Sequence, residues 1–353
     1  MLLPRIQSIA TAVPPYRLDQ DDVVRRAAEL FDGSFADLER LLPVYGNAAI
    51  ESRYSCVPIE WYMADHGFAE RNRLYIENAT ALLERAANDC LAAAHLGPQD
   101  VDAIVAVSTT GIATPSLDAL LMERLPFRRD TQRLPVFGLG CAGGVLGLSR
   151  AAALSRASPD FRVLFLVVEL CALTFRRRDR SKSNIVATAL FGDGAAAALL
   201  SCHGGDGPGV TDWGEHTWPN SLDIMGWDVT DDGLGVLFSR DIPALVRTEL
   251  RAAAEHYLEA QNLTLDDIDS FVCHPGGAKV IDALEEAYGV PQGGLAHTRE
   301  VLRDYGNMSA ATVLFVLERT LAANGLERNG ARRHLLSTLG PGFTAGFLTL
   351  EEA

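Results

Sequence analysis

The sequence has no hydrophobic run that approaches the roughly 20 apolar residues needed to cross a membrane. Its longest apolar stretch, 163–168, stops at Glu169 and has only the length of a strand. The N-terminus also lacks the basic segment and long apolar segment that are typical of a secretion signal. We therefore do not expect an integral membrane protein, and we expect a cytoplasmic location.

The 6 cysteines show no paired Cys-x-x-Cys spacing, and the chain has no excess of basic residues. Without paired spacing or an export signal, reduced thiols are expected rather than disulfides or a zinc site. The formal net charge of −15 argues against general nucleic-acid binding. An anionic substrate must therefore be received by a local basic group, against the overall field of the protein.

The 353 residues do contain an ordinary globular composition, with 48% apolar and 22% charged residues, together with a weak internal duplication. An alanine-rich helix followed by a short apolar strand is predicted at 78–111 and again at 244–277. The segments 140–148 and 306–314 form a second similar pair, and 190–200 and 339–349 form a third. Because the three pairs occur in the same order, we predict an α/β fold of two duplicated halves related by a pseudo-twofold axis. The predicted halves are 1–205 and 206–353, joined by a linker rich in Gly and Asp at 201–212.

Three polar residues stand where an apolar run or a glycine meets a predicted helix start. They are Cys141 in Gly-Leu-Gly-Cys-Ala-Gly-Gly, His274 in Phe-Val-Cys-His-Pro-Gly-Gly and Asn307 in Tyr-Gly-Asn-Met-Ser. Free backbone N–H groups and the helix dipole at such a position favour a thiolate over a thiol. We therefore predict that Cys141 has a lowered pKa, and that the pseudo-twofold axis brings all three residues together.

A thiolate, an imidazole and a carboxamide suit acyl transfer. The thiolate holds an acyl group covalently, and the other two donate hydrogen bonds to a carbonyl or enolate oxygen. A papain-like cysteine protease also uses Cys, His and Asn with a similar Cys-to-His spacing, but its local signature is absent here. Each residue also has a simpler interpretation: Cys141 as a packed core residue, Asn307 as a helix N-cap, and His-Pro-Gly-Gly as a turn.

Six motifs together resemble the type III polyketide synthases, the chalcone and stilbene synthase relatives of the thiolase fold. They are Gly-Cys-Ala-Gly-Gly at 140–144, Leu-Phe-Gly-Asp-Gly-Ala-Ala-Ala at 190–197, Phe-Ser-Arg-Asp-Ile-Pro at 238–243, His-Pro-Gly-Gly at 274–277, Tyr-Gly-Asn-Met-Ser at 305–309 and Gly-Pro-Gly-Phe-Thr at 340–344. The resemblance spans nearly the whole chain and implies a thiolase fold. It also implies that Cys141 is the nucleophile and that His274 and Asn307 promote the decarboxylation of a malonyl thioester.

The same resemblance implies further site residues. Phe191 is the expected gatekeeper between an acyl-CoA tunnel and the cavity, and the loop that shapes the cavity is Gly340, Pro341, Gly342 and Phe343. Cavity walls are expected at Cys171, Thr174, Trp227 and Val236. The cations that bind coenzyme A in the family are poorly matched, which leaves Arg53 and Lys279 as the expected ones. The basic run 176–182 is a possible docking site for an acyl carrier protein, or simply a solvated surface.

The segment 216–235 is similar to bacterial alkylresorcinol and alkylpyrone synthases, which implies a long fatty acyl-CoA starter and several malonyl-CoA units. A single-condensation enzyme similar to ketoacyl synthase III is the alternative, and a type III synthase with another starter and an aromatic product is a third. The resemblance implies a homodimer and no metal, cofactor or prosthetic group.

Overall fold

The computed structural model describes residues 2–31, 43–324 and 332–352. Its strands are β1 (Arg5–Ala12), β2 (Tyr16–Asp19), β3 (Ser52–Ser55), β4 (Ala103–Val107), β5 (Gln132–Val136), β6 (Arg162–Leu170), β7 (Asp193–Ser201), β8 (Gly209–Thr217), β9 (Met225–Thr230), β10 (Gly233–Phe238), β11 (Ser270–Cys273), β12 (Arg332–Gly340) and β13 (Thr344–Glu352).

The α-helices are α1 (Gln20–Phe31), α3 (Pro43–Gly46), α4 (Phe68–Ala93), α5 (Leu117–Leu121), α6 (Gly143–Ala157), α7 (Lys182–Leu190), α8 (Ile242–Leu245), α9 (Arg251–Glu259), α10 (Ala278–Tyr288), α11 (Ala296–Tyr305) and α12 (Thr312–Asn324). Short 3-10 turns that matter for the site are η3 (Gly140–Ala142), η4 (Cys171–Thr174) and η7 (Ser309–Ala311). Within the described ranges, no helix combines the length and the apolar character needed to span a bilayer.

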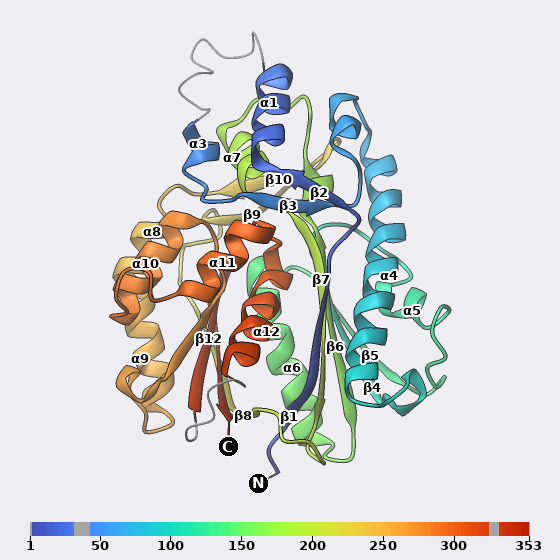
Figure 1. Ribbon diagram of the computed structural model, residues 1–353, viewed down its shortest axis with the longest axis vertical. Helices are drawn as coiled ribbons and strands as arrows, with labels where there is room; N and C mark the ends of the chain where they lie inside the picture. Colours follow the sequence, from blue (N-terminus) through green and yellow to red (C-terminus); the bar gives the residue numbers. More distant parts are fainter. Residues whose placement is uncertain (1, 32–42, 325–331, 353) are drawn as a thin grey trace.

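Nine of the strands form one mixed sheet in the order β11-β12-β13-β8-β1-β7-β6-β4-β5. Helix α4 covers the outer face of one half of this sheet, and α9 and α10 cover the other half, while α6 and α12 lie between the halves (Figure 1). The apolar core around α6 and α12 takes side chains from both halves, such as Phe165 on β6 and Leu336 on β12. The layers are therefore those of a thiolase fold.

The strand order confirms the predicted duplication. In the first half β4 is parallel to β6, which continues antiparallel to β7 and then β1. In the second half β11 is parallel to β12, which continues antiparallel to β13 and then β8. Helix α6 follows η3 in the first half, as α12 follows η7 in the second. Cys141 and Asn307 therefore occupy corresponding positions, as the sequence predicts.

The predicted linker is shorter than expected, because both of its ends belong to strands. β7 runs through Ser201 and β8 begins at Gly209, which leaves only 202–208 as the connection. The backbone N–H of Ile6 on β1 donates to the carbonyl of Pro208 at 3.0 Å. Strand β1 thus lies between the last strand of one half and the first of the other, and joins them into one sheet.

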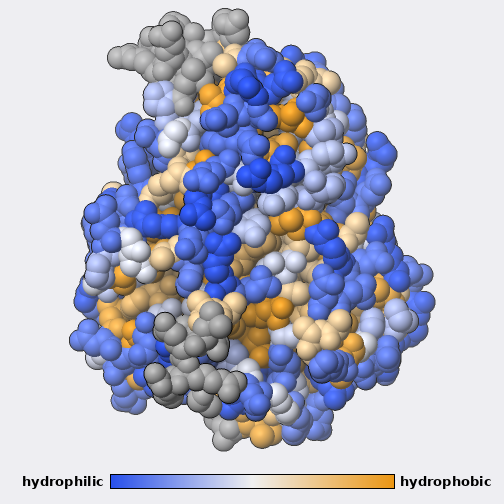
Figure 2. Space-filling model, viewed as in Figure 1, coloured by the Kyte–Doolittle hydropathy of each residue, from blue (hydrophilic) through white to orange (hydrophobic). Residues whose placement is uncertain are grey.

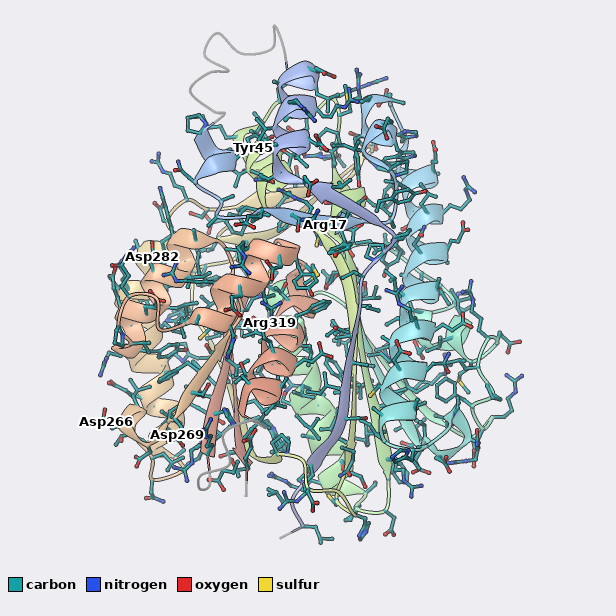
Figure 3. The ribbon with its side chains drawn as sticks, viewed as in Figure 1. Arg17, Tyr45, Asp266, Asp269, Asp282 and Arg319 are labelled. Atoms are coloured by element: carbon teal, nitrogen blue, oxygen red, sulfur yellow. The ribbon has the colours of Figure 1, made fainter. Side chains whose placement is uncertain are left out.

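A smaller layer covers one end of the sheet. It contains α1, α3, α7, the β2–β3 pair and the β9–β10 hairpin (Figure 1). Tyr45, labelled in Figure 3, lies on α3 and its hydroxyl is 2.5 Å from the hydroxyl of Thr188 on α7. This layer lies over the ends of the strands from which the site residues project.

Candidate functional site

Cys141 lies in η3, directly before α6, and its residue is 7% exposed. The glycines that follow it allow two segments to approach closely, since a Cβ at Gly144 would collide with the backbone of Ala310 in η7, directly before α12. The glycine-rich motif therefore packs the nucleophile's helix against its counterpart in the other half. This is the helix-start position that the sequence predicts.

His274 follows the end of β11 and is 5% exposed. Its backbone N–H donates to the carbonyl of Ser337 on β12 at 2.9 Å, which fixes the main chain. The ring has no such bond. Among the described residues, neither Nδ1 nor Nε2 has a hydrogen-bond partner, although both atoms are buried. Buried polar atoms are normally paired, so an imidazole with two free nitrogens suits an oxygen that arrives with a substrate.

Asn307 is fully buried and begins the turn that leads into α12. Its Oδ1 accepts from the backbone N–H of Ser309 at 2.8 Å, which closes an Asx-turn; the N-cap of η7 is Met308, so Asn307 fixes the turn without being its N-cap. Among the residues that the structure describes, its Nδ2 has only a long contact of 3.5 Å to the carbonyl of Gly276. One end of the carboxamide thus fixes the turn, and the N–H end remains a donor near the His274 loop.

One narrow pocket, about 20 Å³ in volume, is lined by Cys141, His274 and Asn307 together. Most of its remaining wall is apolar, with Met225, Phe238, Ile242, Leu250, Val280, Leu284 and Leu339 among the lining residues. A thiol beside two hydrogen-bond donors in an apolar pocket can form a thioester and stabilise a negative oxygen. No group of three or more His, Cys, Asp or Glu side chains in the described part of the chain is arranged to hold a metal ion.

Burial sets the ionisation of this pair of residues. It raises the pKa of the Cys141 thiol to about 12, and a hydrogen bond from Ser309 opposes that rise. Burial also lowers the pKa of His274 to about 3. The predicted low pKa of Cys141 is therefore wrong for the isolated thiol, because loss of solvation outweighs the helix start. Formation of the thiolate therefore requires a proton acceptor, and His274 lines the same pocket.

A second pocket of about 40 Å³ shares Cys141, Met225 and Phe238 with the first. Its wall includes four of the predicted cavity residues, Cys171, Phe191, Trp227 and Val236, together with Pro341. The indole N–H of Trp227 donates to the carbonyl of Thr109 at 2.9 Å, which holds the ring in place.

The Phe191 segment also touches the Asn307 segment. The backbone N–H of Asn307 donates to the carbonyl of Leu190 at 2.8 Å, and that of Gly192 donates to the carbonyl of Asn307 at 3.0 Å. The predicted gatekeeper residue is therefore fixed beside the candidate catalytic carboxamide.

A third and larger cavity, about 90 Å³, adjoins the second through Cys171, Phe191 and Val236, which line both. It lies beneath α1, and its lining includes Leu18, Val23, Ala27, Leu30, Phe31, Ile59, Thr174, Phe175 and Ala187. The outer face of α1 carries hydrophilic residues (Figure 2), so its apolar residues are directed inward. The predicted cavity residues Cys171, Thr174, Phe191 and Val236 do line it, but the sequence gives no sign that residues of α1 form its other wall.

Arg53 is placed differently from a surface cation. It is 3% exposed and donates to the carbonyls of Thr188 at 2.8 Å, Ala189 at 2.7 Å and Phe191 at 3.1 Å. A fourth bond joins its guanidinium to Gln20 on α1. Its charge thus satisfies the carboxyl end of α7, where a cation is favourable. Burial and these four bonds keep the terminal guanidinium nitrogens of Arg53 away from solvent, so its position gives no support to the expectation that it binds the phosphates of coenzyme A.

Other predicted residues lie nearer the edge of the site. Lys279 is exposed in the first turn of α10, next to Val280 of the narrow pocket. Phe343 is 3% exposed and packs on Trp218 with ring centroids 5.5 Å apart. Gly340 and Gly342 belong to the same loop. Gly340, Gly342 and Phe343 line none of the three cavities. Any effect of this loop on the 40 Å³ pocket therefore passes through Pro341, which does line it.

The basic run 176–182 is largely neutralised. Arg176 is bonded to Asp179 and Arg178 to Asp65. Arg180 donates to the carbonyl of Leu30 and lies over the ring of Phe31. Through Arg180 the run 176–182 therefore serves mainly as a structural connection to α1.

Sequence reasoning missed several residues that face the site. Met225 and Phe238 lie on the β9–β10 hairpin, and Ser309 and Thr338 lie beside Cys141. Phe238 and Ser309 belong to two of the motifs on which the resemblance rests, so their place in those motifs could have identified them as site residues. Buried Glu169 also lies close by, and it accepts from the Thr110 hydroxyl at 2.8 Å. Its position depends on folding and leaves no local pattern.

Comparison with known proteins agrees with the acyl-transfer chemistry that this geometry suits. Residues 58–204 match the family model for chalcone and stilbene synthases, N-terminal domain, and residues 214–352 match the C-terminal domain. A "Putative chalcone synthase" of Bacillus subtilis (strain 168) is 42% identical, with 97% of each chain covered. The 1,3,6,8-tetrahydroxynaphthalene synthase of Streptomyces peucetius subsp. caesius is 38% identical over 98% of this chain and 92% of its own.

The crystal structure of 1,3,6,8-tetrahydroxynaphthalene synthase from Streptomyces coelicolor A3(2) superposes with a TM-score of 0.91. It is 28% identical in sequence, and 98% of each chain is covered. That structure is described as a bacterial type III polyketide synthase. This chain therefore belongs to the chalcone and stilbene synthase family, and it is a type III polyketide synthase, an acyltransferase that forms carbon–carbon bonds.

Proposed function

We propose that this synthase loads a long-chain fatty acyl group from its coenzyme A thioester onto Cys141 and extends it with several malonyl-CoA units. It then cyclises the chain to an alkylpyrone or an alkylresorcinol. The observation that carries the proposal is the apolar cavity beneath α1, which adjoins the Cys141 pockets through Cys171, Phe191 and Val236. Burial of a fatty chain there contributes about 0.8 kcal/mol for each CH₂ group.

The proposed chemistry begins with thioester exchange. The Cys141 sulfur forms a bond to the acyl carbon and the bond to the coenzyme A sulfur breaks, so that coenzyme A leaves as its thiol with the proton from Cys141. His274 and the N–H end of Asn307 donate to the thioester oxygen, where negative charge develops. The neutral imidazole favoured by burial has one N–H for this task.

The same donors then serve the extender. The malonyl carboxylate leaves as carbon dioxide, and the electron pair of the broken bond becomes an enolate stabilised by His274 and Asn307. The enolate carbon attacks the acyl carbon on Cys141, and the sulfur leaves as a thiolate. No metal or prosthetic group is needed in this proposal, since the thioesters supply the reactive carbons.

Trp227 and Pro341 support the choice of route for the alkyl tail. Trp227 presents a bulky ring, held by its bond to Thr109, in the pocket next to Cys141. In our proposal this ring blocks the growing chain from extending into that pocket. The boundary formed by Cys171, Phe191 and Val236 then directs the tail toward α1.

A second candidate product is a fused aromatic ring without an alkyl chain. It is favoured by the 38% identity to 1,3,6,8-tetrahydroxynaphthalene synthase of Streptomyces peucetius subsp. caesius. A naphthalene has no long tail, so its synthesis makes no use of the apolar lining beneath α1. We therefore rank it below the alkyl product.

For coenzyme A we propose Lys279 together with Arg240. Arg240 follows the pocket residue Phe238, and its side chain is 97% exposed, with only a 4.0 Å contact to the adjacent Asp241. Both cations are thus available to phosphates, unlike Arg53. Because Arg176, Arg178 and Arg180 of the run 176–182 are engaged, we favour coenzyme A over an acyl carrier protein as the donor.

We also propose that the protein is a homodimer that pairs along β5. This strand is at the edge of the sheet and four of its five residues are exposed. Leu134 is 42% exposed, and Phe137 after the strand is 60% exposed. An open strand edge with exposed apolar side chains is suited to pairing with a second copy.

The test is mass spectrometry of products formed from purified enzyme, malonyl-CoA and a ladder of acyl-CoA starters. Cyclic tri- or tetraketides that increase with starter length would support the proposal, and their masses distinguish a pyrone from a resorcinol. Product from malonyl-CoA alone would favour the naphthalene. A single β-ketoacyl product would instead assign one condensation, as in ketoacyl synthase III, and would contradict the proposal.

A further inference from the structure

The nucleophile and the imidazole come from opposite halves of the fold, so their separation must be set by a contact between halves. Cys141 precedes α6 in the first half, and His274 follows β11 in the second. The Cys141 thiol has a hydrogen bond from Ser309 in the second half, whereas neither ring nitrogen of His274 has a partner among the described residues, so these side-chain contacts do not tie the sulfur to the ring. The main chain of each, however, is bonded to the same two-residue segment of β12.

That segment is Ser337–Thr338. The carbonyl of Ser337 accepts from the backbone N–H of His274 at 2.9 Å. The Thr338 hydroxyl donates to the carbonyl of Cys141 at 2.7 Å, across 197 positions of sequence. Adjacent residues of one strand therefore hold the peptide units of both the candidate nucleophile and the imidazole.

The surroundings of this hydroxyl are tightly packed. Thr338 is 3% exposed and lines the narrow pocket with Cys141, His274 and Asn307. Two residues later, a Cβ on Gly340 would lie only 2.6 Å from the Cβ of Ala142. Strand β12 therefore packs directly on the η3 turn, and the Thr338 hydroxyl donates its hydrogen to the Cys141 carbonyl across this contact.

We propose that Thr338 is a positioning residue that holds Cys141 in register with His274 across the two halves. It does not touch the reacting atoms. Its hydroxyl fixes the peptide that carries the sulfur, while Ser337 fixes the peptide that carries the ring. Proton transfer from sulfur to imidazole depends on short, aligned contact, so a loosened η3 turn lowers the reactive fraction of Cys141.

The test compares Thr338→Val, which removes the hydroxyl at nearly constant shape, with Thr338→Ser, which keeps it. The readout is the rate of iodoacetamide alkylation of Cys141 at pH 7, followed by mass spectrometry of its peptide. We expect Thr338→Val to react about ten-fold more slowly, which corresponds to about 1.4 kcal/mol. Thr338→Ser should restore most of the rate. This assay needs no starter, so its result is independent of the proposed alkyl product.

Two controls separate positioning from general stability. Thr349→Val removes another fully buried hydroxyl, 2.9 Å from the hydroxyl of Tyr257 and away from the site. It should lower the unfolding temperature by a similar amount yet leave the alkylation rate unchanged. In a Cys141→Ala background, Thr338→Val should reduce malonyl-CoA decarboxylation by no more than about two-fold, because that step uses His274 and Asn307.

Three results would overturn the inference. Alkylation of Thr338→Val at the wild-type rate would show that the hydroxyl does not position Cys141. An equal loss in Thr338→Ser, or in Thr349→Val, would assign the effect to packing. A comparable loss of decarboxylation in the Cys141→Ala background would mean that the whole site is disturbed.

Discussion

Replacing His274 with glutamine should remove the thiolate of Cys141 rather than merely weaken it. The amide fills similar space and can still donate a hydrogen bond, but it cannot take a proton from sulfur. Burial raises the pKa of the Cys141 thiol from 9.0 to about 12. The imidazole resists protonation as well, since burial lowers the pKa of His274 to about 3. We expect the mutual attraction of thiolate and imidazolium to compensate both losses of solvation.

The size of the effect follows from the pKa of the thiol. With a pKa of about 12 and no proton acceptor, the thiolate fraction at pH 7 is about 10⁻⁵. This fraction is about a thousand-fold below that of an unperturbed cysteine with a pKa of 9.0. In His274→Gln, alkylation of Cys141 should therefore be very slow at pH 7 and should rise about ten-fold per pH unit up to pH 10 or beyond.

The wild-type profile should differ in shape as well as in height. Proton transfer within the Cys141–His274 pair takes up no proton from solution, so the reactive fraction is independent of pH across the neutral range. The assay is iodoacetamide labelling between pH 6 and pH 10, with the Cys141 peptide quantified by mass spectrometry. His334→Gln is the matched control, because His334 is also a fully buried histidine in the second half.

A flat profile in His274→Gln, or a midpoint below pH 9, would refute this reasoning. Either result would mean that the helix start alone ionises the thiol, as the sequence suggests. A changed profile in His334→Gln would instead indicate that the assay responds to any disturbance of the second half.

Three further predictions concern the cavity, the coenzyme A cations and a buried acid. Ala187→Phe should fill the cavity beneath α1 and shift the preferred acyl-CoA to shorter chains in product analysis, while alkylation of Cys141 stays unchanged; an unaltered preference would contradict the assigned route. Arg240→Glu combined with Lys279→Glu should raise KM for malonyl-CoA at least about ten-fold with little change in kcat, and less so at high salt; an unchanged KM would place the phosphates elsewhere. Burial raises the pKa of Glu169 from 4.5 to about 7, so its stability contribution is fully present below pH 4.5 and is lost as the pH rises through 7. Glu169→Gln should therefore reduce the fall in urea midpoint between pH 5 and pH 8, and an equal fall would contradict the raised pKa.

Much of the fold was predictable because its signals are local and repeated. The alanine-rich helix and apolar strand recur in both halves, and they form α4 with β4 and then α9 with β11. Glycines beside Cys141 marked the close packing of α6, which the collision of a Cβ at Gly144 explains. The thiolase fold and its duplication thus follow from the order of short patterns along the chain.

The candidate site was only partly predictable. Cys141, His274 and Asn307 were identifiable because each stands at an interrupted strand or helix start, and they do line one pocket. The position of Arg53 was not, since an arginine in a polar segment gives no sign that three carbonyls will surround it. Phe343 likewise belongs to a cavity motif but packs into the core beside Trp218.

The sequence by itself determined the residue types and their order: a thiol, an imidazole and a carboxamide at corresponding points of a duplicated α/β chain. Tertiary structure alone decided how those groups ionise, which cations remain free and whether an apolar cavity adjoins the nucleophile. Burial reverses the expected pKa shift of Cys141, and the cavity beneath α1 joins segments from Leu18 to Val236. The physical reason is that solvation and enclosed volume depend on all the atoms around a group, and those atoms come from distant parts of the chain.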